Sequence, residues 1–130
     1  TGDILKYSSA ASAWTNSARY TEVVTNAAPS TTQTIDWSTR NVFNLTLTGN
    51  TTLTFTNPPS GGTMQAVTLI LTQDSTGSRT ITWPTNVRWS YSTAPTISTT
   101  PNYRDVFTFI TFDGGTTYAG AYSMANVAIT

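Results

Sequence analysis

Apolar and hydroxyl-bearing residues alternate along much of the chain. Between residues 42 and 48, and again between 52 and 56, every second residue is apolar and most of the residues between them are threonine. Because successive side chains of a β-strand point to opposite faces, this period of two predicts strands with one apolar and one hydroxyl-rich face. Threonine suits the outer face, since its β-branched side chain favours extended backbone and its hydroxyl faces water.

Turn-forming residues interrupt this pattern about every ten residues after Tyr20, which is typical of a β-sandwich or a barrel. The sequence therefore predicts an all-β fold, an antiparallel β-sandwich with a jelly-roll-like strand order, over residues 21–130. Residues 1–20 differ, because a short strand pattern around Ile4 and Leu5 is followed by a run of small residues. They predict an N-terminal arm or short hairpin module. The strands expected in the sandwich are Thr21–Thr25, Thr32–Asp36, Val42–Thr48, Thr52–Thr56, Met64–Gln73, Arg79–Trp83, Asn86–Trp89, Arg104–Asp113 and Thr116–Ser123.

A first hairpin is expected around Gly49. Pairing Leu47 with Leu53 keeps the apolar residues of the two strands on one face, but this register needs an odd-length loop over residues 49–51. A two-residue turn would place Leu53 on the face opposite Leu47. We therefore predict the odd-length loop.

A second hairpin is predicted around the Asp-Gly-Gly-Thr segment at 113–116, since both glycines tolerate a positive φ. Its register places Phe109 opposite Gly120, and it makes both faces of the ribbon apolar. One face carries Phe107, Phe109, Tyr118 and Tyr122, and the other carries Val106, Ile110 and Phe112. We expect the core of the domain to cover one face and a partner subunit to cover the other. The candidate interface residues are Phe107, Phe109, Tyr118 and Tyr122, together with Ile4 and Leu5 of the arm.

The composition narrows the possible functions. Serine and threonine make up 43 of the 130 residues, charged residues make up 9%, and the formal net charge is zero. This balance leaves no basic surface for nucleic acid. The apolar runs are far shorter than the roughly 20 residues of a membrane helix, so we expect no membrane insertion. The chain starts with Thr1 rather than methionine, which indicates a processed protein or part of a longer one.

The residue types that usually carry catalysis are scarce. The chain has no cysteine and no histidine, which excludes thiolate nucleophiles and disulfides and removes the commonest metal ligand and acid–base side chain. The six acidic residues are scattered, with no pair at a spacing that a strand or turn would bring together, as a glycosidase requires. We predict a protein that is not an enzyme and that has no catalytic residue, metal or cofactor.

The tryptophans allow two interpretations. Aromatic rings can stack on sugars, but tryptophan also fills thin β cores and interfaces, with its N–H bonded to a carbonyl group. Packing is the favoured role for the four tryptophans as a set. For Trp89, which lies between Arg88 and the loop at 90–92, the two roles are evenly matched. The candidate contacts for a glycan or receptor are therefore Arg88, Trp89 and Tyr91.

Several strings of residues recur in the same order in a known group of proteins. Residues 31–122 resemble a domain found repeatedly in tail-fibre and other virion proteins of tailed bacteriophages, including cyanophages. Residues 2–14, with Gly-Asp-Ile-Leu and then Trp14, are similar to a short module that often precedes this domain. The strings that carry the resemblance are TQTIDW (32–37), NLTLTGNTTLTF (44–55), NPPSGG (57–62), LILTQDSTGSRTITWP (69–84), RW (88–89), APT (94–96), DV (105–106) and FDGGTTY (112–118).

The resemblance implies a structural role at the virion surface, a β-rich and usually homotrimeric domain, and no catalytic residue. The expected partners are copies of the chain itself and other virion proteins, together with a host-surface glycan if Trp89 and Tyr91 bind one. The chain departs from the pattern in one place. Similar domains often have Gly-Gly after the Arg/Lys-Trp pair, whereas this chain has Ser-Tyr-Ser at 90–92.

These observations support a tail-fibre-type module for trimeric assembly and host-surface attachment. The alternatives are a capsid decoration (cement) protein that uses its arm to clasp a neighbour, and a subunit of an extracellular filament built by strand exchange. A carbohydrate-binding module that uses Trp89 and Tyr91 is a further alternative. Few charged residues are available to block pairing at the strand edges. This favours self-assembly, which the tail-fibre, capsid-decoration and filament hypotheses all require.

Overall fold

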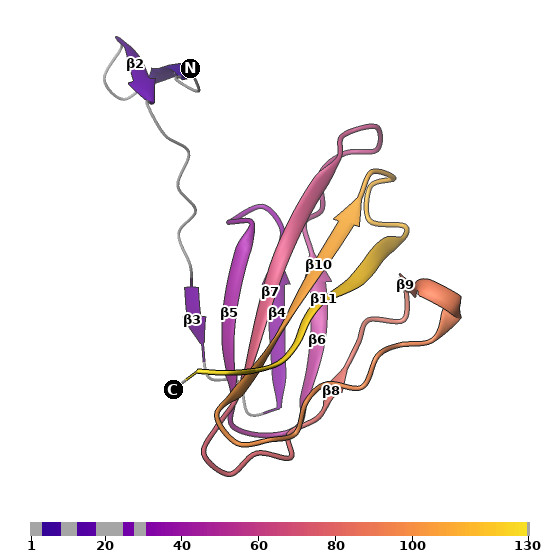
Figure 1. Ribbon diagram of the computed structural model, residues 1–130. Helices are drawn as coiled ribbons and strands as arrows, with labels where there is room; N and C mark the ends of the chain where they lie inside the picture. The colour runs from indigo at the N-terminus through magenta and orange to yellow at the C-terminus, as the bar shows by residue number, and fades with distance from the viewer. Residues whose placement is uncertain (1–3, 9–12, 18–24, 28–30, 130) are drawn as a thin grey trace.

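The computed structural model describes residues 4–8, 13–17, 25–27 and 31–129, with side-chain surroundings from 31 to 129. Strands account for most of these residues (Figure 1). They form a two-stranded sheet, a six-stranded sheet of order β3-β5-β7-β10-β11-β9 and a three-stranded sheet of order β4-β6-β8. The elements are β1 (Ile4–Ser8), β2 (Ala13–Ser17), β3 (Thr25–Ala27), β4 (Thr32–Asp36), β5 (Val42–Leu47), β6 (Thr51–Thr56), β7 (Gln65–Gln73), β8 (Ile81–Thr82), β9 (Val87–Trp89), the 3₁₀ turn η1 (Ser90–Ser92), β10 (Tyr103–Thr111) and β11 (Tyr118–Ala128).

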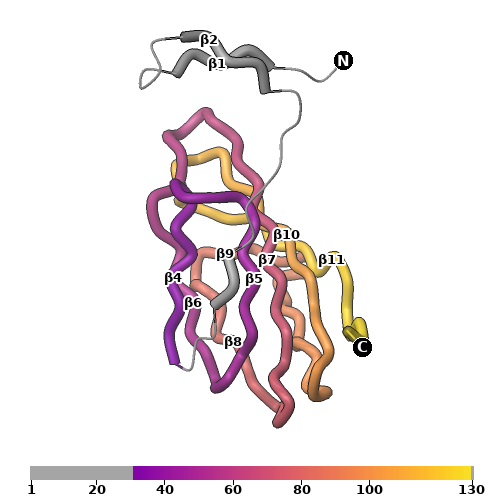
Figure 2. Tube along the Cα trace, turned by 90° about the vertical axis from the view of Figure 1, so that its left-hand side faces the viewer, coloured from indigo at the N-terminus to yellow at the C-terminus, as the bar shows by residue number. Residues whose placement is uncertain are grey.

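The chain passes from one sheet to the other at every step between β3 and β9. The odd-numbered strands of this stretch lie in the six-stranded sheet and the even-numbered strands lie in the three-stranded sheet. Figure 2 shows β4 and β6 on one side of the molecule and β5, β7 and β10 on the other. Strands reached after one full winding run in the same direction, so β3–β5–β7 and β4–β6–β8 are parallel.

The all-β sandwich is therefore confirmed, but the expectation of purely antiparallel pairing is wrong. The pair β9–β11 is also parallel, and the antiparallel pairs are β1–β2, β7–β10 and β10–β11. The jelly-roll order is not confirmed. The expected hairpin with Leu47 opposite Leu53 is also wrong, because β5 and β6 belong to different sheets. Both leucines are buried, since they meet the core from opposite sides.

The core fills the space between the two sheets. Phe107 and Phe109 of β10 have no exposed surface, and Phe55 of β6 meets Phe109 edge to face across the core, with ring centroids 5.1 Å apart. Edge-to-face pairs of this kind add to the apolar area that they bury. The buried hydrophobic residues are Ile35, Trp37, Phe43, Leu45, Leu47, Leu53, Val67, Leu69, Leu71, Val87, Ile97, Phe107, Phe109 and Tyr118.

The second predicted hairpin is confirmed in register. β10 and β11 pair with Phe109 opposite Gly120 and Phe107 opposite Tyr122. The glycines of the turn at 113–116 both have a positive φ, 71° and 78°. Asp113 fixes this turn, because its carboxylate accepts hydrogen bonds from the backbone N–H and the hydroxyl of Thr117, at 3.0 and 2.7 Å. These bonds lower the pKa of Asp113 below its usual value.

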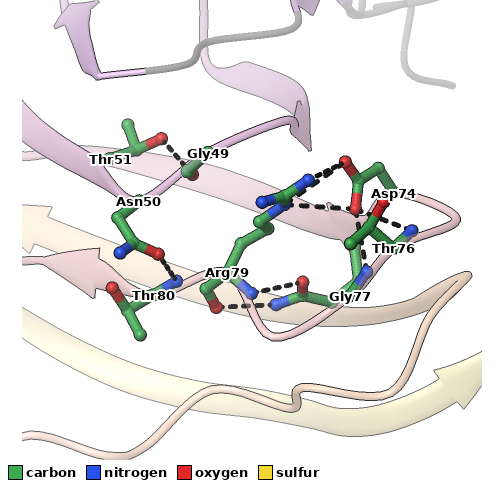
Figure 3. Close-up of polar contacts among 9 residues, drawn as sticks. Gly49, Asn50, Thr51, Asp74, Thr76, Gly77, Arg79 and Thr80 are labelled. Carbon is green, nitrogen blue, oxygen red and sulfur yellow. Dashed lines mark hydrogen bonds and ion pairs between the residues drawn. The ribbon is translucent and has the colours of Figure 1, made fainter.

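The connection between β7 and β8 is fixed by side chains at both of its ends (Figure 3). Asp74 accepts hydrogen bonds from the backbone N–H groups of Thr76 and Gly77, and it forms an ion pair with Arg79 at 2.8 Å. The hydrogen bonds from Arg79 lower the pKa of Asp74. Gln73, buried at the end of β7, donates from its amide to the carbonyl oxygens of Arg79 and Ser98. This connection is therefore tied to the loop that precedes β10.

Candidate functional site

The predicted interface residues of the second hairpin face the interior. Phe107, Phe109 and Tyr118 are 0 to 2% exposed within a single chain, so a partner subunit cannot contact their rings. Their assignment to a subunit interface is therefore wrong. Tyr122 is half-buried and its ring stacks on Phe107 at 4.6 Å. The side chains of Ile4 and Leu5 lie outside the described residues.

The face of the six-stranded sheet that points away from the core is not covered by the three-stranded sheet, and we call it the open face. Its residues alternate with the core residues of β5, β7, β10 and β11, and they are small or apolar. Among the described residues, this face carries two charged side chains, Arg104 at one end and Arg88 on the edge strand β9 opposite Ala119. The large hydrophobic residues most exposed along this face are Met64 (62%), Phe112 (65%) and Met124 (53%). The other outward residues include Val42, Asn44, Ala66, Thr68, Ile70, Val106, Thr108, Ile110, Ala119 and Ala121.

Trp89 has a structural role. It lies opposite Gly120 in the parallel pair β9–β11, and a Cβ on Gly120 would be 2.8 Å from the indole ring. The ring also contacts Phe109 at 5.7 Å. The glycine that the sequence placed opposite Phe109 therefore makes room for Trp89.

Tyr91 is presented to solvent by a strained turn. Its side chain is 99% exposed, and both Tyr91 and Ser92 have φ values of 56°. Left-handed backbone at a residue that is not glycine costs roughly 1–2 kcal/mol, and such strain gathers at binding and catalytic sites.

Arg88 extends from the opposite side of β9. It is exposed, and its Nη1 donates a hydrogen bond to the carbonyl oxygen of Thr85 at 3.1 Å. A hollow of about 340 Å³ lies between Arg88 and Ser92 and is also lined by Val87 and Trp89. The structure thus brings Arg88, Trp89 and Tyr91 together at one corner of the sandwich, but each has different surroundings.

Two further hollows have residues of the 93–97 segment in their walls. The first, of about 310 Å³, has Trp89, Pro95 and Tyr122 in its walls. The second, of about 220 Å³, has Trp83 and Pro95 in its walls. Neither Trp83 nor Pro95 was expected at this corner from the sequence. Their order along the chain gives no sign of it, because β8, β11 and the 93–97 segment meet only in the fold.

Ser92→Gly is expected to leave the free energy of unfolding unchanged or to raise it by up to about 1 kcal/mol. Glycine relieves the crowding at positive φ, but it also gains entropy in the unfolded chain. Ser90→Gly is the matched control, because Ser90 is not among the residues with positive φ, and it should lower the free energy of unfolding by about 0.5–1 kcal/mol. Urea denaturation compares the two. Equal losses would contradict the left-handed turn.

No cluster suited to a metal ion is present among the described residues, since none of them form a group of three or more acidic, histidine or cysteine side chains. The buried carboxylate of Asp105 has a structural role. It accepts hydrogen bonds from the backbone N–H and hydroxyl of Ser98, at 2.6 and 2.7 Å, and from the N–H of Asn126, at 2.8 Å.

Within the residues that the structure describes, no helix has the length and hydropathy of a membrane span.

Residues 21–117 match the family model described as "Putative phage tail fibre C-terminal domain". The chain belongs to this family. Searches of curated proteins and of solved structures found no match. The resemblance seen in the sequence is confirmed at the level of the family, and the tail fibre domain is a structural component of the virion. The match supports the tail-fibre hypothesis rather than a capsid decoration protein or a filament subunit.

Proposed function

We propose that this tail fibre domain assembles as a homotrimer through the open face of its six-stranded sheet and attaches the virion to the host surface. The observation that carries the assembly is the chemistry of that face, where Met64, Phe112 and Met124 are exposed over a width of three strands. Large exposed apolar surfaces mark sites of protein association. Other virion proteins would hold the trimer in the particle.

The scarcity of charge on this face favours a second copy of the same chain as the partner. Rotational symmetry brings copies of one surface together, so like charges on that surface would repel. Here Ile70 lies between Asn44 and Val106 across the sheet, and Thr68 lies between Val42 and Thr108. The middle of this face can therefore pack against its copy without placing charge against charge.

Attachment is supported by the corner around Tyr91. The Tyr91 ring is almost wholly exposed on strained backbone and contributes nothing to the core, which supports a role in a contact outside the chain. The virion surface is where such a contact would be made.

The mass of the chain in solution tests the assembly. Light scattering during size-exclusion chromatography is expected to give a mass near three times 14.0 kDa. Ile110→Glu, which places a charge on the open face, should give monomers, because an unpaired charge buried in an apolar interface is strongly unfavourable. Thr54→Glu, on the exposed face of the three-stranded sheet, is the control and should remain trimeric. A monomeric natural chain would overturn the trimer, and a trimeric Ile110→Glu variant would overturn this choice of face.

A further inference from the structure

We propose that the two hollows beside Pro95 form one groove that binds an uncharged host-surface glycan, with Trp83 and Trp89 as the surfaces on which its sugar rings stack. This inference rests on the proposed attachment function and names its ligand. The rings of Trp83 and Trp89 meet edge to face with centroids 5.1 Å apart, so the aromatic floor continues from one hollow to the other. Pro95 lines both hollows.

The lining of the groove matches the two kinds of surface on a sugar. Trp83 and Ile81 lie in one hollow and Trp89 in the other, which suits the apolar C–H faces of pyranose rings. Hydroxyl groups, which can exchange hydrogen bonds with sugar hydroxyls, are contributed to the lining by Thr80, Thr96 and Thr99 in the first hollow and by Ser90, Thr93 and Tyr122 in the second.

Charge excludes several other ligands. Neither hollow is lined by a carboxylate, and Arg79, the one cation in the lining, is already paired with Asp74 at 2.8 Å. A nucleic acid or an anionic lipid requires cations that are free to neutralise phosphate. The volumes, about 220 and 310 Å³, lie at or below the lower end of the range for sites that take drug-sized molecules. Each hollow is therefore suited to one sugar unit of a chain.

The wall of the groove is held in place before any ligand arrives. At one end of the 93–97 segment, the backbone N–H of Thr93 donates to the carbonyl oxygen of Ser90, and its hydroxyl donates to the carbonyl oxygen of Tyr91. At the other end, Ile97 is buried and the next residue, Ser98, is held by Asp105 and Gln73. A preformed wall reduces the conformational entropy that binding would cost.

The indole N–H signals in NMR spectra test the groove directly. The 130-residue chain would be titrated with neutral tetrasaccharides of glucose, galactose, mannose and N-acetylglucosamine. Concentrations up to about 10 mM are used, because a site with a dissociation constant near 1 mM is then close to saturation. At least one tetrasaccharide is expected to give saturable shifts of the Trp83 and Trp89 signals. The Trp37 signal should not shift, because Trp37 is 2% exposed and lies in the core.

Two variants fill the groove and one serves as the control. Thr93→Arg and Thr96→Arg place long side chains at exposed positions on the rim, and each should weaken binding at least about tenfold. Thr96→Arg should leave the thermal stability unchanged, whereas Thr93→Arg also removes the hydroxyl bond to the Tyr91 carbonyl oxygen. Thr54→Arg makes the same change on the three-stranded sheet and should bind like the natural chain.

Several outcomes would overturn the groove. One is that no neutral tetrasaccharide shifts Trp83 and Trp89, and another is that a threonine-rich peptide shifts them while the sugars do not. Binding that survives both rim variants would also contradict it. The proposed function is tested separately, because the mass in solution reports assembly. Adsorption of the labelled natural chain to host cells reports attachment, whether or not the groove takes part.

Discussion

Replacing Phe109 with alanine is expected to lower the free energy of unfolding by about 3–5 kcal/mol. Phe109 has no exposed surface, and its ring meets Phe55 from the opposite sheet at 5.1 Å and the rings of Trp83 and Trp89 at 5.7 Å. Alanine would leave a cavity where the two sheets meet. Denaturation in urea at one fixed chain concentration measures the loss.

Tyr91→Ala is the control for this experiment. It also removes an aromatic ring, but from a side chain that is 99% exposed, so the free energy of unfolding should change by no more than about 0.5 kcal/mol. If Phe109→Ala fails to fold, Phe109→Leu gives a smaller cavity and a measurable loss. A loss below about 1 kcal/mol for Phe109→Ala would show that a single chain does not enclose this ring.

Gly77→Ala is expected to lower the free energy of unfolding by about 2–5 kcal/mol, because backbone strain and steric overlap act together. Gly77 has a φ of 72°, and a Cβ there would lie 2.6 Å from the carbonyl oxygen of Thr99 and 2.9 Å from the ring of Pro101. The loop has little freedom to move away, because Ser78 donates its N–H to the same oxygen at 2.8 Å and Asp74 holds the other side (Figure 3). Thermal or urea unfolding would show the loss.

Gly62→Ala separates the two contributions. Gly62 also has a positive φ, 89°, but a Cβ there would meet no atom within 4 Å. This variant should therefore show backbone strain alone, about 1–2 kcal/mol. The difference between the two variants measures the contact with Thr99 and Pro101. If both variants lose the same stability, the loop relaxes and the contact is not rigid.

The positions of the strands could be predicted from the sequence, because a period of two is a local signal. β4 occupies Thr32–Asp36 as expected, and most other strands differ from expectation by one or two residues. The partner of each strand could not be predicted in the same way. Leu47 and Leu53 are buried whether their strands pair side by side or face one another across the core. Alternation indicates which side of a strand is buried but not which sheet the strand joins.

The candidate site was predicted only in part, because both faces of β10 are apolar. The choice between them depends on neighbouring strands, where Thr108 lies beside Thr68 and Ala121 on the outer face. Small and hydroxyl-bearing neighbours could have identified that face as the outer one. No pattern in the sequence could have predicted the groove beside Pro95. Its walls come from β8, β11 and the 93–97 segment, which only the tertiary structure brings together.

The back-and-forth winding of the chain determines when this domain can form during synthesis. β10 lies between β7 and β11 and contributes Phe107 and Phe109 to the centre of the core, yet it is among the last strands to be translated. The parallel pairs that precede it close long loops, and their contacts compensate the lost chain entropy only after both sheets are present. Until β10 and β11 are synthesised, the earlier strands lack the hairpin that completes the six-stranded sheet. We therefore expect the domain to fold only after this hairpin has left the exit tunnel.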